Sequence, residues 1–272
     1  LFIDCDPGAH DSVALMLAFA APDLFDILGV TTVAGNVAAA LTARNACVIR
    51  EIPGREKDAV FAGADRPLVV DPVEADHFHG ERGLGDLPFD APRRGAERVG
   101  ALQFLSETLT GAAPHSVSIA VTGPLTNIAL VLRGAPTIAR AVREIVVMGG
   151  ARSEGGNITA SAEFNIYADP HAAEIVFASG LPVVVLGLDV THQVRTSPAR
   201  MARLESLADP RARAVCRLLR FGEHVERTLA KREGAPLHDP CVIAYLMAPE
   251  LFETRPCRIA VETASPLTRG HT

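Results

Sequence analysis

The sequence lacks the patterns that mark membrane proteins, nucleic-acid-binding proteins and disulfide scaffolds. No apolar run is as long as a membrane span, and no run of Lys or Arg suggests contact with nucleic acid or an anionic membrane surface. The five cysteines are scattered and none shares a CxxC spacing, which argues against a zinc site or a redox pair. Isolated thiols among apolar neighbours are typical core residues, and a reducing cytoplasm is the compartment that we expect.

The chain is also without an internal repeat or a linker. Its 272 residues, 48% of them hydrophobic, are enough for one large core. We therefore expect a single domain over residues 1–272. The sequence opens on a predicted strand without Met or a signal peptide, and it stops without a terminating element, so we expect truncation at both ends.

Apolar strand segments alternate with helix patterns along the chain. This order predicts an α/β fold with a mostly parallel, doubly wound, Rossmann-like sheet flanked by helices. Residues 63–97 show no sustained period and are predicted to form a long loop over a site. The predicted strands are 1–3, 26–33, 60–62, 116–121, 143–150, 182–188 and 258–262, and the main helices follow Asp11, Asn36, Arg98, Asp169, Asp209 and Asp239.

The stretch with the most candidate functional residues lies at the start of the sequence. Asp4, Asp6, His10 and Asp11 fall within eight positions, where a strand gives way to a turn and a helix. Open α/β sheets place their ligand crevice at such a strand end. Neighbouring carboxylates repel one another, and a hard divalent cation relieves that repulsion. The alternative is structural: Asp11 caps the helix and Asp6 shapes the turn.

The segment 4–11, DCDPGAHD, resembles the DxDPGxDD signature of the nucleoside hydrolase family, inosine-uridine preferring type. His10 stands where that signature has the first Asp of its final pair. Four later segments resemble the family as well. They are 79–85 (HGERGLG, like the HGxxGLG flap), 122–129 (TGPLTNIA), 162–173 (AEFNIYADPHAA) and 238–240 (HDP).

These later segments also have plainer interpretations. Asp169 before Pro170 indicates a helix cap, and Asp239 before Pro240 has the same local pattern. Glu163 is two positions from Asn165, so in an extended turn both side chains would face one pocket. The histidines near residue 79 would be incidental if the long loop were only surface.

The resemblance implies Ca²⁺-dependent hydrolysis of the N-glycosidic bond of ribonucleosides, giving free base and ribose. It implies that Ca²⁺ is bound by the carboxylates of Asp6, Asp11 and Asp239 and by the backbone carbonyl of Thr122. Asp6 would also take the proton of the attacking water, and His238, with His79 as a second candidate, would protonate the leaving base. The substrate contacts implied are His10, Asn36, His79, Met148, Asn157, Glu163 and Asn165. The partners expected are a small nucleoside and further copies of the chain in a homodimer or homotetramer.

Two other functions are compatible with parts of the sequence. The first follows from His10, which lacks the negative charge of the family Asp. If catalysis requires that charge, the protein is a catalytically weak or inactive nucleoside- or ribose-binding protein. A metal-dependent phosphohydrolase is disfavoured, since Arg82 is the only cation in the motif segments. The helix before the HDP motif has no tyrosine, which argues against a purine-specific enzyme but leaves the preferred base open.

Overall fold

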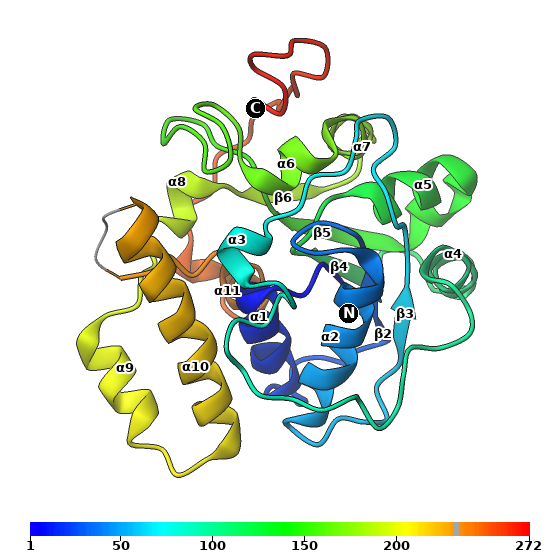
Figure 1. Cartoon of the computed structure of the whole chain (residues 1–272). Coiled ribbons are helices and arrows are strands. Elements are labelled where there is room, and N and C mark those ends of the chain that lie inside the picture. Colours follow the sequence, from blue (N-terminus) through cyan, green and yellow to red (C-terminus); the bar gives the residue numbers. More distant parts are fainter. Residues whose placement is uncertain (231–233) are drawn as a thin grey trace.

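The protein is described by a computed structural model over residues 1–230 and 234–272. Its strands form one parallel sheet in the order β3-β2-β1-β4-β5-β6. The chain builds outward from β1 to β3 and then crosses back to β4 on the other side of β1, so the order reverses between β1 and β4. The predicted doubly wound sheet is confirmed (Figure 1). The strands are β1 (Phe2–Cys5), β2 (Gly29–Thr32), β3 (Val60–Ala62), β4 (Val117–Val121), β5 (Val142–Met148) and β6 (Val183–Leu186).

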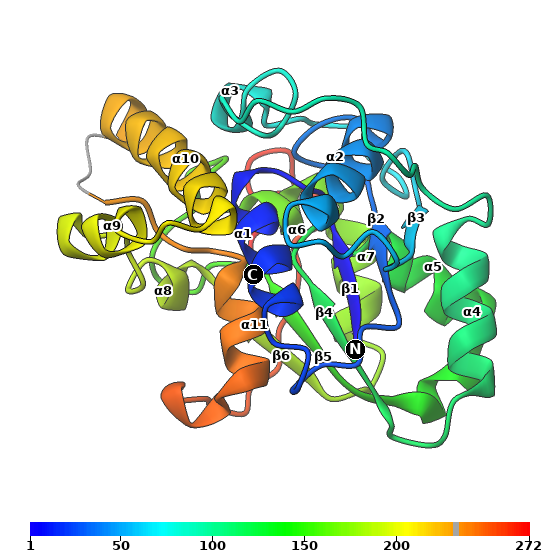
Figure 2. The same cartoon turned by 90° about the horizontal axis from the view of Figure 1, so that it is seen from below.

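Helices cover both faces of the sheet, because successive strand residues point to opposite sides. Ile3 and Val146 pack in one core with α1 (Ala9–Phe19), α2 (Ala39–Glu51) and α11 (Pro240–Met247). Phe2 and Ile145, each one residue away, pack in the second core. Figure 2 shows α1 and α11 on one side of the strands and α4 and α5 on the other. The helices of the second face are α4 (Ala101–Gly111), α5 (Thr126–Gly134) and α7 (Pro170–Phe177), with the 3₁₀ helix Pro136–Ala141 between α5 and β5.

Smaller elements surround the carboxyl end of β1. A helical hairpin of α9 (Pro198–Glu205) and α10 (Pro210–Val225) packs beside α1, and α3 (Asp76–His79) in the long loop contacts α10 (Figure 1). A π-helical turn follows α10, and a 3₁₀ turn follows α11. Two further short helices are α6 (Phe164–Ala168) and α8 (Leu188–Thr191). Within the described residues, no helix is long and apolar enough to cross a membrane.

The predicted strand at 258–262 is wrong. These residues are exposed or half-buried and form no ladder with the sheet, whose β6 edge pairs only with β5. Glu262 instead donates its N–H to the His271 carbonyl at 2.9 Å and accepts from Gly270 at 2.8 Å. The apolar residues Ile259 and Val261 are compatible with a strand, but a strand also needs a partner edge, and local sequence does not encode one.

The long loop is anchored to α2 by a buried cation. Arg50 is fully buried, and its guanidinium donates to the carbonyls of Asp58 at 2.7 Å, Gly95 at 3.1 Å and Arg94. The acceptors are backbone dipoles rather than carboxylates, and the guanidinium Nε is buried without a partner among the described residues, so the hydrogen bonds offset part of the cost of burying the charge. Arg50 thereby ties the far end of the loop to the helix that flanks the site.

Replacing Arg50 by Met should lower the free energy of unfolding by about 2–4 kcal/mol, because three backbone carbonyls lose the charged donor that joins them to α2. Urea unfolding followed by circular dichroism measures the change. Arg133→Met, on an exposed position of α5, is the matched control and should stay within about 0.5 kcal/mol of the wild type. Equal stability of Arg50→Met and Arg133→Met would show that the anchor is dispensable.

Candidate active site

The carboxyl ends of β1 and β4 meet where the strand order reverses. Asp6 follows β1, Asn36 lies in the loop after β2, and Thr122 follows β4. Because parallel strands end at the same edge of a sheet, these residues converge although 116 positions separate Asp6 from Thr122. An open α/β sheet forms its ligand crevice at such a reversal.

Asp6 is enclosed by backbone. Its Oδ2 accepts the Asn36 N–H at 2.8 Å, whereas its Oδ1 is buried and has no hydrogen-bond partner among the described residues. Gly35 and Gly123 press against the carboxylate: a Cβ at these positions would lie 2.1 and 2.7 Å from its oxygens. Only glycine allows this approach, so the surrounding loops hold the carboxylate in one orientation.

Asp11 joins three loops through its carboxylate. Oδ1 accepts the Thr122 hydroxyl at 2.7 Å and the Asp6 N–H at 3.3 Å. Oδ2 accepts the Gly8 N–H at 3.1 Å and the Asn36 amide at 3.0 Å. The bond to Gly8, the N-cap residue of α1, confirms the helix-capping alternative for Asp11. The bonds to Thr122 and Asn36 also place it inside the predicted site.

Asp239 differs from the other aspartates that precede a proline at a helix start. The side chain of Asp169 accepts the N–H of Ala172, and that of Asp209 accepts the N–H of Arg211, so both cap their helices. Asp239 makes no side-chain cap bond to α11, although it is buried. The helix-cap interpretation is therefore confirmed for Asp169 and wrong for Asp239, whose carboxylate faces the other acids of the site.

The acids of the site have strongly shifted titration. Burial, and next the charge of Asp11, raise the pKa of Asp6 and of Asp239 well above the usual value for Asp. Burial also raises the pKa of Asp11, against the hydrogen bond from Thr122. No ion pair within the described residues joins any of the three to Lys or Arg. Such carboxylates gain most from a bound cation.

A hard divalent cation fits this donor set. Three buried carboxylates, the unpartnered Asp6 Oδ1 and a nearby backbone carbonyl are the oxygen ligands that Ca²⁺ takes. Across residues 1–230 and 234–272, no group of three His, Cys, Asp or Glu side chains is already arranged around a point that would hold a metal. The site suits a divalent cation because of its charge, its burial and the unpaired Asp6 oxygen, and not because its side chains already surround a metal position.

Asn165 and Glu163 connect the ends of β4 and β5. The Asn165 amide donates to the carbonyls of Thr122 at 2.7 Å and Met148 at 3.1 Å. Glu163 is the N-cap of α6: its carboxylate accepts the N–H groups of Asn165 and Ile166, and that of Gly150 at 3.1 Å. Glu163 itself is extended, whereas Asn165 lies in the first turn of α6, so the extended turn that would align the two residues does not form, although both side chains reach the strand ends. Burial raises the pKa of Glu163 to about 7.

Asn157 is more exposed than the other predicted contacts. Its Oδ1 accepts the Phe164 N–H at 2.9 Å, which fixes the side chain at the entrance to α6. The side-chain nitrogen of Asn157 makes no hydrogen bond among the described residues. The structure thus brings Asn157 to the same helix start as Glu163 and leaves it one donor for a ligand.

Three of the predicted histidines, His10, His79 and His238, form a second half of the site. The rings of His10 and His238 lie 5.2 Å apart between centroids, and those of His10 and His79 lie 6.1 Å apart. His79 Nδ1 accepts the Ala9 N–H at 3.2 Å, which docks the flap on the start of α1. Burial lowers the pKa of His10 to about 4, and burial followed by the charge of His10 lowers the pKa of His238 well below the usual value for histidine. These two rings are neutral at pH 7.

His10 points its Nε2 toward α10. This nitrogen is buried without a partner and lies 3.6 Å from where a Cβ of Gly222 would be. The structure therefore places the imidazole between the flap, α10 and His238. The longer side chain that replaces the family Asp extends into space that glycine at position 222 leaves open.

Sequence reasoning missed two polar residues that organise the site. Asn45 on α2 donates its amide to the carbonyls of Pro7 at 3.0 Å and Arg82 at 2.8 Å, and so joins the signature turn to the flap. Thr191 Oγ1 lies 2.8 Å from His238 Nδ1. The partners are 37 to 47 positions away in sequence, and the surrounding helix patterns contain no signal for them.

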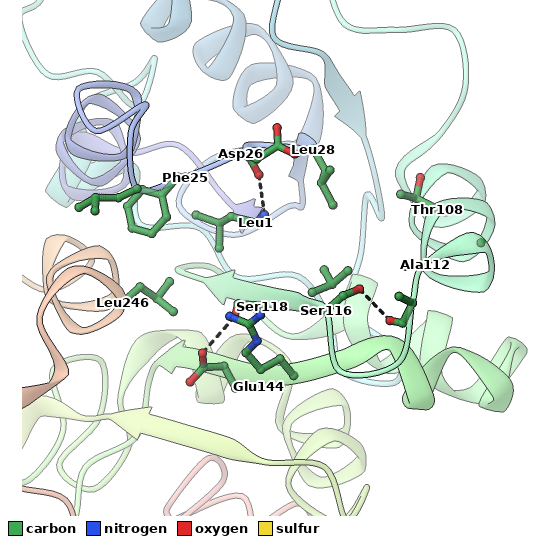
Figure 3. A pocket seen from close by; sticks show the side chains of 15 residues that line it. Leu1, Phe25, Asp26, Leu28, Thr108, Ala112, Ser116, Ser118, Glu144 and Leu246 are labelled. Atoms are coloured by element: carbon green, nitrogen blue, oxygen red, sulfur yellow. Dashed lines mark hydrogen bonds between the residues drawn. The ribbon is translucent and has the colours of Figure 1, made fainter.

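A groove of about 580 Å³ lies elsewhere on the molecule. It opens at the amino ends of β1 and β4 and is lined by Leu1, Phe25, Ser118, Glu144 and Leu246, among others (Figure 3). Ser118 donates to Glu144 at 3.0 Å, so its most polar wall is already paired. None of the predicted site residues lines this groove, and it lacks the buried acids of the opposite end.

Comparisons with known proteins give matches along the whole chain. The family model described as inosine-uridine preferring nucleoside hydrolase matches residues 1–272. The pyrimidine-specific ribonucleoside hydrolase RihA of Citrobacter koseri is 42% identical over 273 residues, covering 100% of this chain and 86% of that protein. The solved structure of the plant nucleoside hydrolase PpNRh1 superposes with a TM-score of 0.94 at 30% identity, covering 99% of this chain and 85% of the other. The purine-preferring ribonucleoside hydrolase from Gardnerella vaginalis gives 0.93 at 32% identity, covering 99% and 86%.

Asp4, the first acid of the signature, has a structural role below the site. Its Oδ1 accepts the Thr31 hydroxyl at 2.6 Å and the Asn127 amide at 2.8 Å, while Oδ2 is buried without a partner. Burial raises the pKa of Asp4 to about 7, against these two hydrogen bonds. Asp4 thus links β1 to β2 and α5. With a pKa of about 7, its carboxyl is close to half protonated at neutral pH.

This shift predicts a pH-dependent stability. Between the unfolded pKa of 3.8 and the folded pKa of about 7, the native state binds the Asp4 proton more tightly than the unfolded state does, so stability falls as pH rises. Relative to Asp4→Asn, which cannot titrate here, the wild type should lose up to about 4 kcal/mol between pH 4 and pH 7.5. Chemical denaturation across this range tests it; parallel pH curves for the two proteins would refute the shift.

Proposed function

The chain belongs to the inosine-uridine preferring nucleoside hydrolase family and cleaves N-ribosyl bonds, and from this premise we propose that it hydrolyses pyrimidine ribonucleosides with a bound Ca²⁺ ion. The products are the free base and ribose. The observation that carries the metal part of the proposal is the buried, unpartnered Oδ1 of Asp6, which belongs to a group of three carboxylates that form no ion pair with Lys or Arg among the described residues.

Two observations favour a pyrimidine substrate. Relatives named pyrimidine-specific ribonucleoside hydrolase are 42% identical to the whole chain, compared with 32% for the neighbour named purine-preferring. The helix α10, which borders the imidazole half of the site, has no tyrosine: Tyr167 lies on α6 and Tyr245 on α11. The wall next to the leaving base therefore has no phenol to stack on, or protonate, a large purine.

The residues that would hold Ca²⁺ are Asp6, Asp11 and Asp239 through their carboxylates and Thr122 through its carbonyl. When bound, the ion supplies Lewis acidity that makes a water molecule easier to deprotonate. The Asn165 amide already donates to the Thr122 carbonyl at 2.7 Å, and this bond orients the carbonyl at the end of β4.

Asp6 is the base in this proposal. Its Oδ1 has no competing hydrogen bond, so it is free to take a proton from the attacking water, while the bond from Asn36 to Oδ2 keeps the carboxylate in place. Bond cleavage develops positive charge on the sugar ring, as in other glycosidases. The buried acids Asp6, Asp11 and Glu163 lie where negative charge stabilises that ring.

The amides of the site orient the ribose. Asn36 and Asn165 donate their amide hydrogens to protein oxygens, which leaves their side-chain carbonyl oxygens to accept from sugar hydroxyls. Glu163 accepts backbone N–H groups and keeps lone pairs for the same purpose. Asn157 supplies a donor at the rim, and Met148 gives an apolar contact. Holding the hydroxyls in a reactive geometry contributes several kcal/mol in comparable reactions.

The leaving base departs on the histidine side. His238 and His79 are the groups that donate a proton or a hydrogen bond to it. Because burial lowers the pKa of His238, a neutral imidazole N–H, rather than an imidazolium, faces the base at pH 7. A nucleoside-binding protein without turnover is less well supported, because the named relatives hydrolyse ribonucleosides.

The proposal is tested by reducing-sugar release from uridine, cytidine, inosine and adenosine, with Ca²⁺ and with chelator. We expect Ca²⁺-dependent release that is fastest with uridine or cytidine. Asp239→Asn should lose about 100-fold or more in rate. Asp209→Asn is the control. Asp209 also precedes a proline at a helix start, and Asn caps a helix as well as Asp does, so this variant should keep full activity. Binding without any release would instead support the nucleoside-binding alternative.

His10 gives a separate prediction. A neutral imidazole lacks the negative charge that supports the developing cation, so His10→Asp should raise the hydrolysis rate of uridine by about tenfold or more. His10→Asn, similar in size to Asp but uncharged, is the matched control and should not produce the gain. If His10→Asp is no faster than the wild type, the imidazole is an adaptation of this enzyme rather than a loss.

A further inference from the structure

Thr191 lies where two distant segments of the site meet. It is the last residue of α8, which follows β6, and it is fully buried. Its Oγ1 is 2.8 Å from Nδ1 of His238, which is 47 positions later and precedes α11. No other hydrogen bond of this hydroxyl occurs among the described residues. The pair therefore connects α8 directly to the ring beside the leaving base.

Burial decides the direction of this hydrogen bond. A hydroxyl has one hydrogen to donate, and leaving it buried without an acceptor is costly. If Nδ1 carried the proton and donated to Oγ1, the Thr191 hydrogen would have no acceptor. If Thr191 donates to an unprotonated Nδ1, both groups are satisfied. The second arrangement puts the ring proton of neutral His238 on Nε2.

The opposite edge of the ring is the one left for a ligand. Thr191 covers Nδ1, yet His238 as a residue keeps accessible surface, and its Nε2 is not among the buried unpartnered atoms. The rings of His10 and His192 flank it, with centroids 5.2 and 5.8 Å away. An N–H on Nε2 would therefore point into the space that these rings border.

The element that carries Thr191 is itself fixed. The Asp189 carboxylate accepts the N–H groups of Arg152 at 2.7 Å and Ser153 at 2.9 Å. Nδ1 of His192, the residue after Thr191, lies 2.9 Å from a carboxylate oxygen of Glu154. These contacts tie α8 to the loop that leads to Asn157, so the hydroxyl is presented to His238 from a rigid support.

We propose that Thr191 is a positioning residue that donates to His238 Nδ1 and so holds the ring in the Nε2–H tautomer, ready to donate to the departing base. The inference rests on the proposed function for its consequence, but the tautomer itself is independent of turnover. A neutral histidine has two tautomers, and its partner at one nitrogen selects which of them faces the substrate.

The first test is long-range ¹H–¹⁵N NMR of the ¹⁵N-histidine-labelled full chain. His238 of the wild type should show an unprotonated, hydrogen-bonded Nδ1 and a protonated Nε2. In Thr191→Val, which keeps the shape but removes the hydroxyl, the Nδ1 signal should move to the position of a free nitrogen or the tautomers should mix. Thr191→Ser should restore the wild-type signal. A protonated Nδ1 in the wild type would overturn the inference.

The second test separates positioning from mere stability. Thr191→Val should lower kcat for uridine by about 10- to 100-fold with little change in KM, and Thr191→Ser should recover most of the rate. Thr42→Val removes another buried hydroxyl, which donates to the Ala39 carbonyl on α2, and should change neither the His238 signals nor kcat. Equal rates for the Val and Ser variants, with melting curves like the wild type, would refute the positioning part. Absence of ribose release by the wild type would refute the proposed function and leave the tautomer result standing.

Discussion

The site depends on keeping several buried carboxylates close together. Neighbouring negative charges repel one another, and burial further raises the free-energy cost of ionising them. Asp11 offsets it with four hydrogen bonds, from Thr122, Asp6, Gly8 and Asn36, which join the loops after β1, β2 and β4. The same bonds that make the acids tolerable also fix their positions. What remains unpaired, Asp6 Oδ1, is where a cation or a water proton gains the most.

In the proposed reaction, the arrangement would separate the two charges that N-glycosidic cleavage creates. The acidic half formed by the strand ends would stabilise the positive charge that develops on the sugar. The half that contains His10, His79 and His238 would receive the departing base. Because the flap brings His79 and α10 borders His10, the second half is built from elements outside the sheet. In the proposed function, the strand ends of the core thus supply the acids, and the covering segments contact the base.

The imidazole at position 10 matches its surroundings in size. Its Nε2 approaches α10 at Gly222, where a Cβ would lie 3.6 Å away, in ordinary van der Waals contact. The DxDPGxDD signature has Asp at this position, which is a shorter and charged group. The His10 ring reaches to within 5.2 Å of the His238 ring between centroids, so a change at this one residue affects both halves of the site.

By itself, the sequence determined the strand and helix order, the acids at the end of β1 and the family, because hydrophobic periodicity and short motifs are local properties of the chain. The tertiary structure decided which of the Asp-Pro helix starts are only caps, that 258–262 has no strand partner, that Glu163 begins a helix, and that Thr191 contacts His238. Each of these depends on a hydrogen bond made or not made, often between residues tens of positions apart. Local patterns do not specify such pairings; the packing of the sheet and its covering helices does.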